Sequence, residues 1–156
     1  MLFLDNTVLS NFALAEAAQL IMALWPEQVG TTQAVMDEYH FAEQHDLLPT
    51  GRWDDLPIFA VGEEEQKLAE TLSRRLGRGE RTCIAVARKR KGIFASDDAD
   101  ARAAATKLGV PVTGTVGILL QAVRRSVISL PRANELLEKM IAAGYRSPVD
   151  RLDSLL

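Results

Sequence analysis

Short apolar runs alternate with longer segments of helical periodicity along almost the whole chain. The runs at 2–4, 93–96 and 110–113 are typical of buried strands, and 57–61 is predicted to be a short edge strand because it starts with a proline. Strands that alternate with helices favour a parallel sheet with helices on both faces. The sequence therefore predicts an α/β fold.

Apolar residues at helical spacing, together with helix-ending glycines, set the predicted helices. Thr31 and Thr32 are good helix-start residues for one of them, and residues 45–56, rich in Pro, Gly and Asp, are predicted to be a loop. The predicted helices cover residues 8–24, 33–44, 63–76, 80–91, 99–108, 115–124 and 132–143, with a last short one at 148–156.

A chain of 156 residues suits one compact domain, and we expect a single domain over 1–156 whose C-terminal helices begin at about 132. The single Cys83 excludes an internal disulfide, and the two histidines form no cluster with zinc spacing. No signal peptide and no apolar stretch long enough to span a bilayer is recognisable. A soluble cytoplasmic protein that does not enter a membrane is the expectation.

Acidic residues follow two of the predicted strands. Asp5 comes directly after the first apolar run, and Asp97-Asp98 follow the run that ends at Ser96. Because sites in open parallel sheets lie beyond the carboxyl ends of the strands, we expect these acids and the segment 113–115 at one rim. A simpler interpretation is that Asp98 caps the helix that starts at Ala99 and that Asp5 caps the first helix.

Two further acids fall on the apolar faces of predicted helices. Glu38 lies in an arc that also contains Phe41, whereas Asp37 points to the polar side. Glu80 points in the direction of Cys83, although it could also be a first-turn acid that interacts with the helix dipole. A buried carboxylate needs a partner, and converging carboxylates suit a hard divalent cation such as Mg²⁺ or Mn²⁺.

The basic residues are unevenly distributed. The formal net charge of −3 and the pI of about 5.4 argue against a chain that is basic throughout. Eight of the 18 Lys and Arg residues nevertheless lie between Arg74 and Lys91. Such a patch can attract a phosphate backbone, with Arg78, Arg81 and Arg88 as candidate contacts, or it can simply be a solvated helix face.

The ordered set of these motifs resembles PIN domains, the nuclease fold that includes many toxins of bacterial and archaeal toxin–antitoxin pairs. Order and spacing match over almost the whole chain, and the Gly-Glu and Asp-Asp pattern, with helices after residue 130, is similar to a less typical subgroup. The matching pieces are residues 2–10, Glu38, Gly79-Glu80 followed by Ala85, Ser96-Asp97-Asp98, and residues 114–120.

The resemblance implies a three-layer α/β/α sandwich with a central parallel sheet and a carboxylate cluster that holds one or two Mg²⁺ or Mn²⁺ ions. Asp5 and Asp98 would be the principal ligands, and Glu38 and Glu80 would complete the cluster or hold a second ion. The same resemblance leaves Asp97 open as a ligand in place of Asp98. It also implies that Thr7 and Thr115 are polar neighbours that orient the ligands or a water molecule.

The implied activity is metal-dependent hydrolysis of RNA phosphodiester bonds, with an antitoxin protein as partner and a homodimer as the expected assembly. Two alternatives stay open. A phosphohydrolase of the haloacid dehalogenase type also places Asp after two strands, but it usually needs a second Asp where this chain has Thr7. A non-catalytic binding module could use apolar residues of the early helix, such as Leu20, Met22 and Trp25, which are more often core residues.

Overall fold

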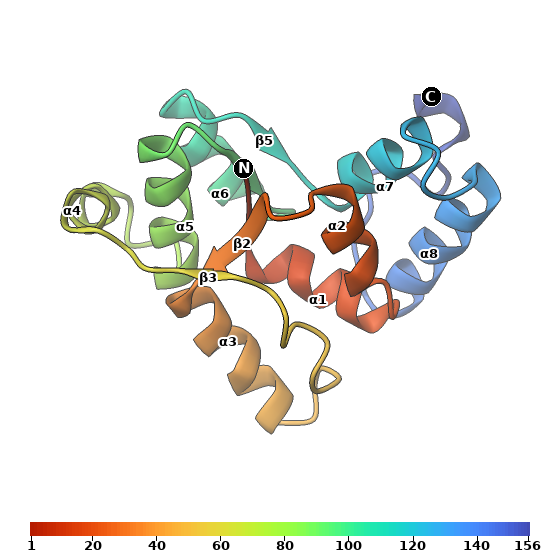
Figure 1. The fold of residues 1–156 in the computed structure, drawn as a ribbon, viewed down its shortest axis with the longest axis horizontal. Coiled ribbons are helices and arrows are strands. Elements are labelled where there is room, and N and C mark those ends of the chain that lie inside the picture. Colours follow the sequence, from red (N-terminus) through yellow and green to blue (C-terminus); the bar gives the residue numbers. More distant parts are fainter.

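Five parallel strands form one sheet in the order β3-β2-β1-β4-β5 in the computed structural model, which describes residues 1–156 (Figure 1). The strands are β1 Leu2–Leu4, β2 Val29–Thr32, β3 Ile58–Phe59, β4 Ile93–Ala95 and β5 Val112–Thr113. The central strand β1 pairs in parallel with both β2 and β4, and its three residues are fully buried. This confirms the predicted α/β class and the parallel sheet.

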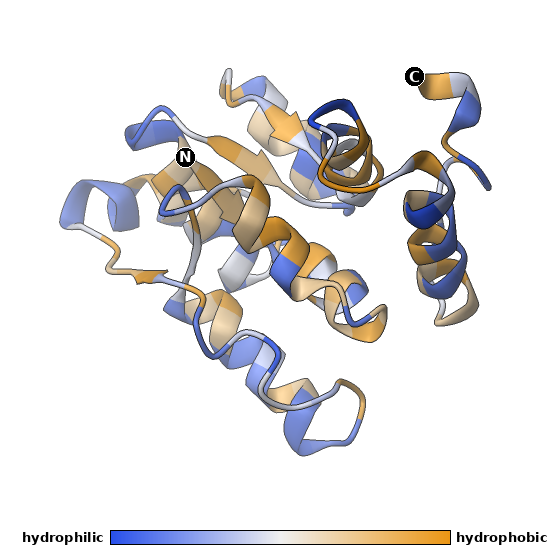
Figure 2. Cartoon of the chain, turned by 45° about the vertical axis from the view of Figure 1, so that its right-hand side comes forward, coloured by the Kyte–Doolittle hydropathy of each residue, from blue (hydrophilic) through white to orange (hydrophobic).

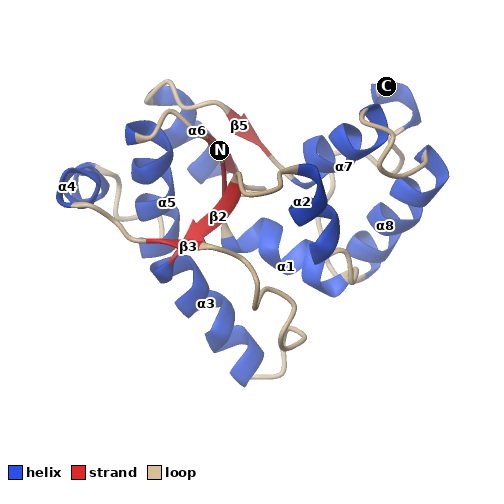
Figure 3. Cartoon of the chain, viewed as in Figure 1, coloured by secondary structure: helices blue, strands red, loops and turns tan.

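Helices cover both faces of this sheet. Because parallel crossovers are right-handed, the outward path from β1 to β3 and the return path to β4 and β5 direct their helices to opposite faces. Figures 1 and 3 show α4 and α5 on one side of the strands and α1, α2, α7 and α8 on the other, as the three-layer sandwich requires. The helices are α1 Asn6–Leu14, α2 Ala18–Leu24, α3 Gln33–Gln44, α4 Glu63–Thr71, α5 Arg78–Lys89, α6 Ala99–Lys107, α7 Thr115–Arg124 and α8 Leu130–Ala142.

The strand β2 is absent from the sequence-based prediction. It is only four residues long and contains Gly30, and glycine weakens a strand signal. The structure requires glycine here because a Cβ at Gly30 would lie 2.2 Å from the ring of Phe59 on β3. Thr32 ends β2 and also caps α3, since its hydroxyl accepts a hydrogen bond from the amide of Val35. The predicted helix start was therefore right, and the strand before it was missed.

The helix predicted over 8–24 is two helices, α1 and α2, which are bent by 117° relative to each other. The break lies at Ala15–Ala17, where Glu16 adopts a positive φ of 57°. No single helix is long and apolar enough to cross a membrane, although this bent pair reaches the required length and composition when counted together. Most of its apolar residues are buried in the core.

Other helix ends differ from the prediction by a few residues. The helix predicted to reach residue 76 ends at Thr71, and α5 begins at Arg78 rather than Glu80. Helix α8 begins at Leu130 because the hydroxyl of Ser129 caps it, and a proline stands in its first turn. The segment 148–156 contains only a short 3₁₀ turn, Asp153–Leu155.

The core lies around β1 and the helices that pack on it. Figure 2 colours the central strands mainly as hydrophobic, whereas most helices carry both hydrophobic and hydrophilic residues. The predicted loop at 45–56 folds back onto this core, and the indole of Trp53 donates a hydrogen bond of 3.0 Å to the carbonyl of Leu9. Leu20, Met22 and Trp25 are half-buried and pack against the core, which agrees with the expectation that such residues more often belong to the core than to an interface.

Candidate carboxylate site

Asp5 directly follows β1 and is 1% exposed. Its Oδ1 accepts a hydrogen bond of 2.7 Å from the amide of Asn6, and its Oδ2 accepts one of 2.7 Å from the hydroxyl of Ser96 and one of 3.3 Å from that of Thr7. Burial raises the pKa of Asp5 to about 6, and the charge of Glu38 adds to this, while the three hydrogen bonds oppose it. Asp5 is thus a carboxyl group with a raised pKa, fixed by hydrogen bonds at the carboxyl end of the central strand.

Asp98 lies at the neighbouring strand end. It caps α6, since its Oδ1 accepts a hydrogen bond of 2.8 Å from the amide of Ala101. Its own amide donates to the hydroxyl of Ser96 at 3.1 Å, so that one hydroxyl links Asp98 to Asp5. The capping role expected from the sequence is therefore present, but it uses only one oxygen of Asp98.

Glu38 and Glu80 approach this rim from two helices. The Oε1 of Glu38 accepts a hydrogen bond of 3.0 Å from the amide of Gly79, and the Oε2 of Glu80 accepts one of 2.9 Å from the amide of Gly77. Both of these oxygens lie within 4 Å of the position that a Cβ at Gly77 would take. The start of α5 therefore gathers the two carboxylates beside each other.

The pKa of Glu80 reports the proximity of all four acids. Burial and, to a smaller extent, the charges of Asp5, Asp98 and Glu38 together raise it to about 7, against the hydrogen bond from Gly77. Asp97 makes no contribution of this kind. The structure thus gathers Asp5, Glu38, Glu80 and Asp98 in one neighbourhood.

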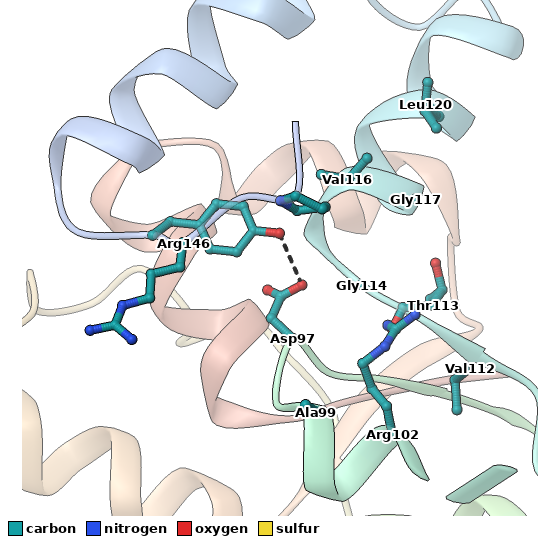
Figure 4. Close-up of a pocket in the computed structure, with 12 residues that line it drawn as sticks. Asp97, Ala99, Arg102, Val112, Thr113, Gly114, Val116, Gly117, Leu120 and Arg146 are labelled. Atoms are coloured by element: carbon teal, nitrogen blue, oxygen red, sulfur yellow. Dashed lines mark hydrogen bonds between the residues drawn. The ribbon is translucent and has the colours of Figure 1, made fainter. Parts of the chain in front are cut away.

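The carboxylate of Asp97 is occupied by hydrogen bonds within the protein. Its Oδ1 accepts from the amide of Thr115 at 2.8 Å and from the hydroxyl of Tyr145 at 3.3 Å, the dashed contact in Figure 4. Its Oδ2 accepts from the hydroxyl of Thr115 and from the side-chain amide of Asn11 at 3.0 Å. The amide of Asp97 donates to the hydroxyl of Thr7 at 2.9 Å. Four donors on one carboxylate indicate a positioning role.

Asn11 and Tyr145 are missing from the sequence-based site. Asn11 is one of several polar residues of α1, and no sequence signal distinguished it from the others, although it is only 9% exposed. Tyr145 had none either, since it follows α8 in an irregular segment. Burial and the nearby charge of Asp97 raise the pKa of Tyr145 above its ordinary value, so its hydroxyl remains a hydrogen-bond donor.

The basic cluster separates into different environments. Arg78 shares a surface hollow with Glu38, and Arg74, Arg78 and Arg81 line a second hollow beside it. None of these three forms an ion pair, and the Nε of Arg81 is buried without a hydrogen-bond partner. Arg88 lies about 12 Å further along α5 than Glu80, on the basis of helix rise, so the fold does not bring it to the acids.

One sequence-based assignment in this region needs correction, and one member of the basic cluster is engaged elsewhere. Phe41 was predicted to share the buried arc of Glu38, but it is 61% exposed and lines the hollow that contains Arg78. Arg90 belongs to the basic cluster by sequence only, because it forms a two-pronged ion pair with Glu65 at 2.8 and 2.9 Å. That pair fastens α5 to α4 and leaves Arg90 unavailable for a ligand.

The donor chemistry of the site fits a hard divalent cation. Four carboxylates lie together without any Lys or Arg partner, and the side-chain oxygen of Asn6, next to Asp5, is buried without a hydrogen-bond donor. No three acidic, His or Cys side chains are grouped closely enough to hold a metal ion in the conformation described. Glu38 and Glu80 each use one oxygen to accept a backbone amide at the start of α5, and the other oxygen of each accepts no hydrogen bond within the protein.

A family model described as a PIN domain matches residues 1–156. The chain belongs to the PIN domain family. PIN domains are in general nucleases, and PIN nucleases usually use divalent metal ions such as Mg²⁺ or Mn²⁺. Neither the curated proteins nor the solved structures gave a match.

In this PIN domain the two threonines hold the acids in place. The hydroxyl of Thr7 bridges the Oδ2 of Asp5 and the amide of Asp97, and Thr115 binds the carboxylate of Asp97. Thr7 is also the position at which a haloacid-dehalogenase-type enzyme would need its second Asp. A hydroxyl group engaged in this way offers no acid or base in its place.

Proposed function

We propose that this PIN domain is a metal-dependent endoribonuclease. The observation that supports this most directly is that Asp5, Glu38 and Asp98 lie near Glu80 without a cationic partner, so that burial and these three charges together raise the pKa of Glu80 to about 7. Like charges held together in this way are costly unless a cation or protons neutralise them. A divalent cation is the partner that the family's chemistry supplies.

In this proposal Asp5, Asp98 and Glu80 hold the cation and Glu38 completes the cluster or holds a second ion. When bound, the cation supplies Lewis acidity that neutralises phosphate charge and makes water more acidic. Ser96 keeps Asp5 and Asp98 in register through one hydroxyl. Asp97 takes no part as a ligand, because Asn11, Thr115 and Tyr145 donate hydrogen bonds to its carboxylate.

RNA is proposed as the substrate because the chain resembles the toxin nucleases of its family. Arg78, which shares a hollow with Glu38, and Arg81, which shares the next hollow with Arg78, form no ion pairs and would bind the phosphate backbone as it approaches the acids. The proposal extends to a toxin role with an antitoxin protein partner and to a homodimer. Exposed Phe41 and Ile58, which line hollows that also contain Arg78, offer apolar contacts for such a partner.

The proposal is tested by incubating a mixed RNA substrate with the protein in Mn²⁺ or Mg²⁺. We expect cleavage by the wild-type protein, none in a chelator, and a loss of at least about a hundredfold in Asp5→Asn purified in parallel. Glu27→Gln, a change of the same kind on the exposed surface, is the matched control and should cleave normally.

A second measurement separates the proposal from a binding module and from a phosphatase. Titration with Mn²⁺ should show a saturable site in the wild-type protein and a much weaker one in Asp5→Asn. A wild-type protein without a saturable Mn²⁺ site, or one whose RNA cleavage survives in Asp5→Asn, would contradict the assignment. Hydrolysis of p-nitrophenyl phosphate without RNA cleavage would favour the phosphohydrolase alternative.

A further inference from the structure

A hollow of about 740 Å³ lies beside Asp97, and none of the four clustered carboxylates lines it (Figure 4). Three segments surround it: the start of α6, the β5–α7 connection, and the chain that follows α8. Its volume falls within the range of roughly 300–1,000 Å³ that is usual for ligand pockets. The hollow is therefore large enough for a small organic ligand.

Two guanidinium groups give this hollow an excess of positive charge. Arg102 uses a single nitrogen, Nη1, to donate hydrogen bonds of 2.9 Å to the carbonyl of Ser96 and 2.8 Å to that of Thr113. Arg146 is exposed and makes no hydrogen bond or ion pair within the protein. Asp97, the one acid in the lining, is occupied by four donors. Two arginines without carboxylate partners suit a phosphate group.

Apolar side chains form another part of the lining. These are Val112, Val116, Leu120 and Pro148, and Figure 4 shows Val112 beside Arg102 and Val116 and Leu120 above it. The floor depends on Gly114, because a Cβ at that position would lie 2.6 Å from the Oδ1 of Asp97 and 3.0 Å from the Nη1 of Arg102. A pocket with an unpaired guanidinium at one edge and apolar side chains along its wall fits a phosphate that carries a base and sugar.

The hollow and the proposed catalytic site share one stretch of backbone. Asp97 lies in it, while the residues on either side, Ser96 and Asp98, belong to the carboxylate cluster. Tyr145, from the segment after α8, forms part of the hollow and binds Asp97 directly. A group held in the hollow is therefore close to the acids, and the C-terminal segment takes part in holding it.

We propose that this hollow binds one nucleotide of the RNA, adjacent to the phosphodiester that is cleaved. Arg146, which has no partner within the protein, takes its phosphate, and the apolar side chains of Val112, Val116, Leu120 and Pro148 take its base and ribose. This inference rests on the proposed ribonuclease function and specifies where that function gains selectivity for a neighbouring nucleotide.

The test measures binding without catalysis. Calorimetry in the presence of a chelator follows inorganic phosphate and each of the four nucleoside 5′-monophosphates. The proteins compared are the wild type, Arg146→Glu, Val116→Trp, which fills the hollow, and Lys107→Glu, a matched charge reversal at an exposed position outside it. Thermal unfolding of each variant checks that the fold is retained; if Val116→Trp does not fold, Val116→Phe takes its place.

We expect at least one nucleotide to bind the wild type and Lys107→Glu equally, and more tightly than inorganic phosphate. Binding should weaken about tenfold or more in Arg146→Glu, because a charge-assisted contact is lost and a repulsion is added. It should also weaken in Val116→Trp. Equal binding by all four proteins, or no saturable nucleotide binding by the wild type, would overturn the assignment of the hollow.

The binding result is independent of the catalytic one. Asp5→Asn should lose RNA cleavage yet bind the nucleotide as the wild type does, because Asp5 does not line the hollow. If the protein cleaves RNA but its nucleotide affinity is unchanged in Arg146→Glu and Val116→Trp, the assignment of the hollow is wrong and the nuclease proposal stands. Nucleotide binding in the hollow by a protein that cleaves no RNA would refute the nuclease proposal instead.

Discussion

The Oε1 of Glu38, on α3, accepts a hydrogen bond of 3.0 Å from the amide of Gly79, at the start of α5. A Cβ at Gly79 would lie 2.8 Å from this oxygen and 3.0 Å from the carboxyl carbon of Glu38. The absence of a side chain at Gly79 thus allows Glu38 to reach the site.

Gly79→Ala should therefore separate stability from metal binding. Alanine in a helix is favoured over glycine by up to about 1 kcal/mol, and the atoms it meets belong to the end of a flexible side chain. The free energy of unfolding should change by no more than about 1 kcal/mol, whereas Mn²⁺ affinity should fall because Glu38 is displaced. Denaturant unfolding and Mn²⁺ titration check both; unchanged affinity would remove Glu38 from the ligand set.

Asp5→Asn should stabilise the metal-free protein above pH 6. The pKa of Asp5 is about 6 in the folded protein and 3.8 ordinarily, so the folded state binds this proton more tightly than the unfolded state does. Its contribution to stability therefore falls as pH rises from about 4 to 6, by about 3 kcal/mol if the whole shift is realised. Unfolding curves at pH 4 and pH 8 should show the variant gaining relative to the wild type only at the higher pH.

Mn²⁺ affinity should rise with pH between about 5 and 8. Burial and mutual repulsion raise the pKa of Asp5 to about 6 and that of Glu80 to about 7, so protons compete with the metal at acid pH. Replacing Asp98 by Asn removes one of the charges that raise the pKa of Glu80, which should shift the profile toward lower pH. A flat profile in the wild type would exclude these two groups as ligands.

Asp97→Asn and Asp98→Asn should have different effects. An amide at position 97 cannot accept all four hydrogen bonds that reach the Asp97 carboxylate, so we expect a loss of about 1–3 kcal/mol of stability together with reduced cleavage. Asp98 accepts one capping bond, which an Asn accepts almost as well. Asp98→Asn should retain stability and lose metal affinity. The reverse pattern would make Asp97 the ligand.

Charge removal along α5 should reveal which arginines contact RNA. Arg78→Ala and Arg81→Ala should weaken binding of an uncleaved RNA and each lower the dependence of log K on log salt by about 0.7 for a single strand. Arg88→Ala should change neither quantity, because Arg88 is about 12 Å further along the helix than Glu80. Equal slopes for all three variants would indicate non-specific attraction by the whole patch.

Much of the fold was predictable because its signals are local. Buried strands such as β1 and β4 are short apolar runs, and helix ends are marked by residues such as Ser129 and Thr32 that cap them. The strand β2 escaped because Gly30 weakens its signal and its threonines also suit a helix start. Glycine is needed at position 30 because the ring of Phe59 lies against it, and no local pattern encodes the proximity of a residue 29 positions away.

The sequence by itself determined the alternation of strands and helices, and with it the rim at which Asp5 and Asp98 meet, because parallel strands end on one edge. Only the tertiary structure distinguished the surroundings of the adjacent acids Asp97 and Asp98. Asn11 lies 86 positions before Asp97 and Tyr145 lies 48 positions after it, and both donate hydrogen bonds to its carboxylate. Such contacts depend on how whole helices pack, whereas caps and periodicity depend on neighbours along the chain.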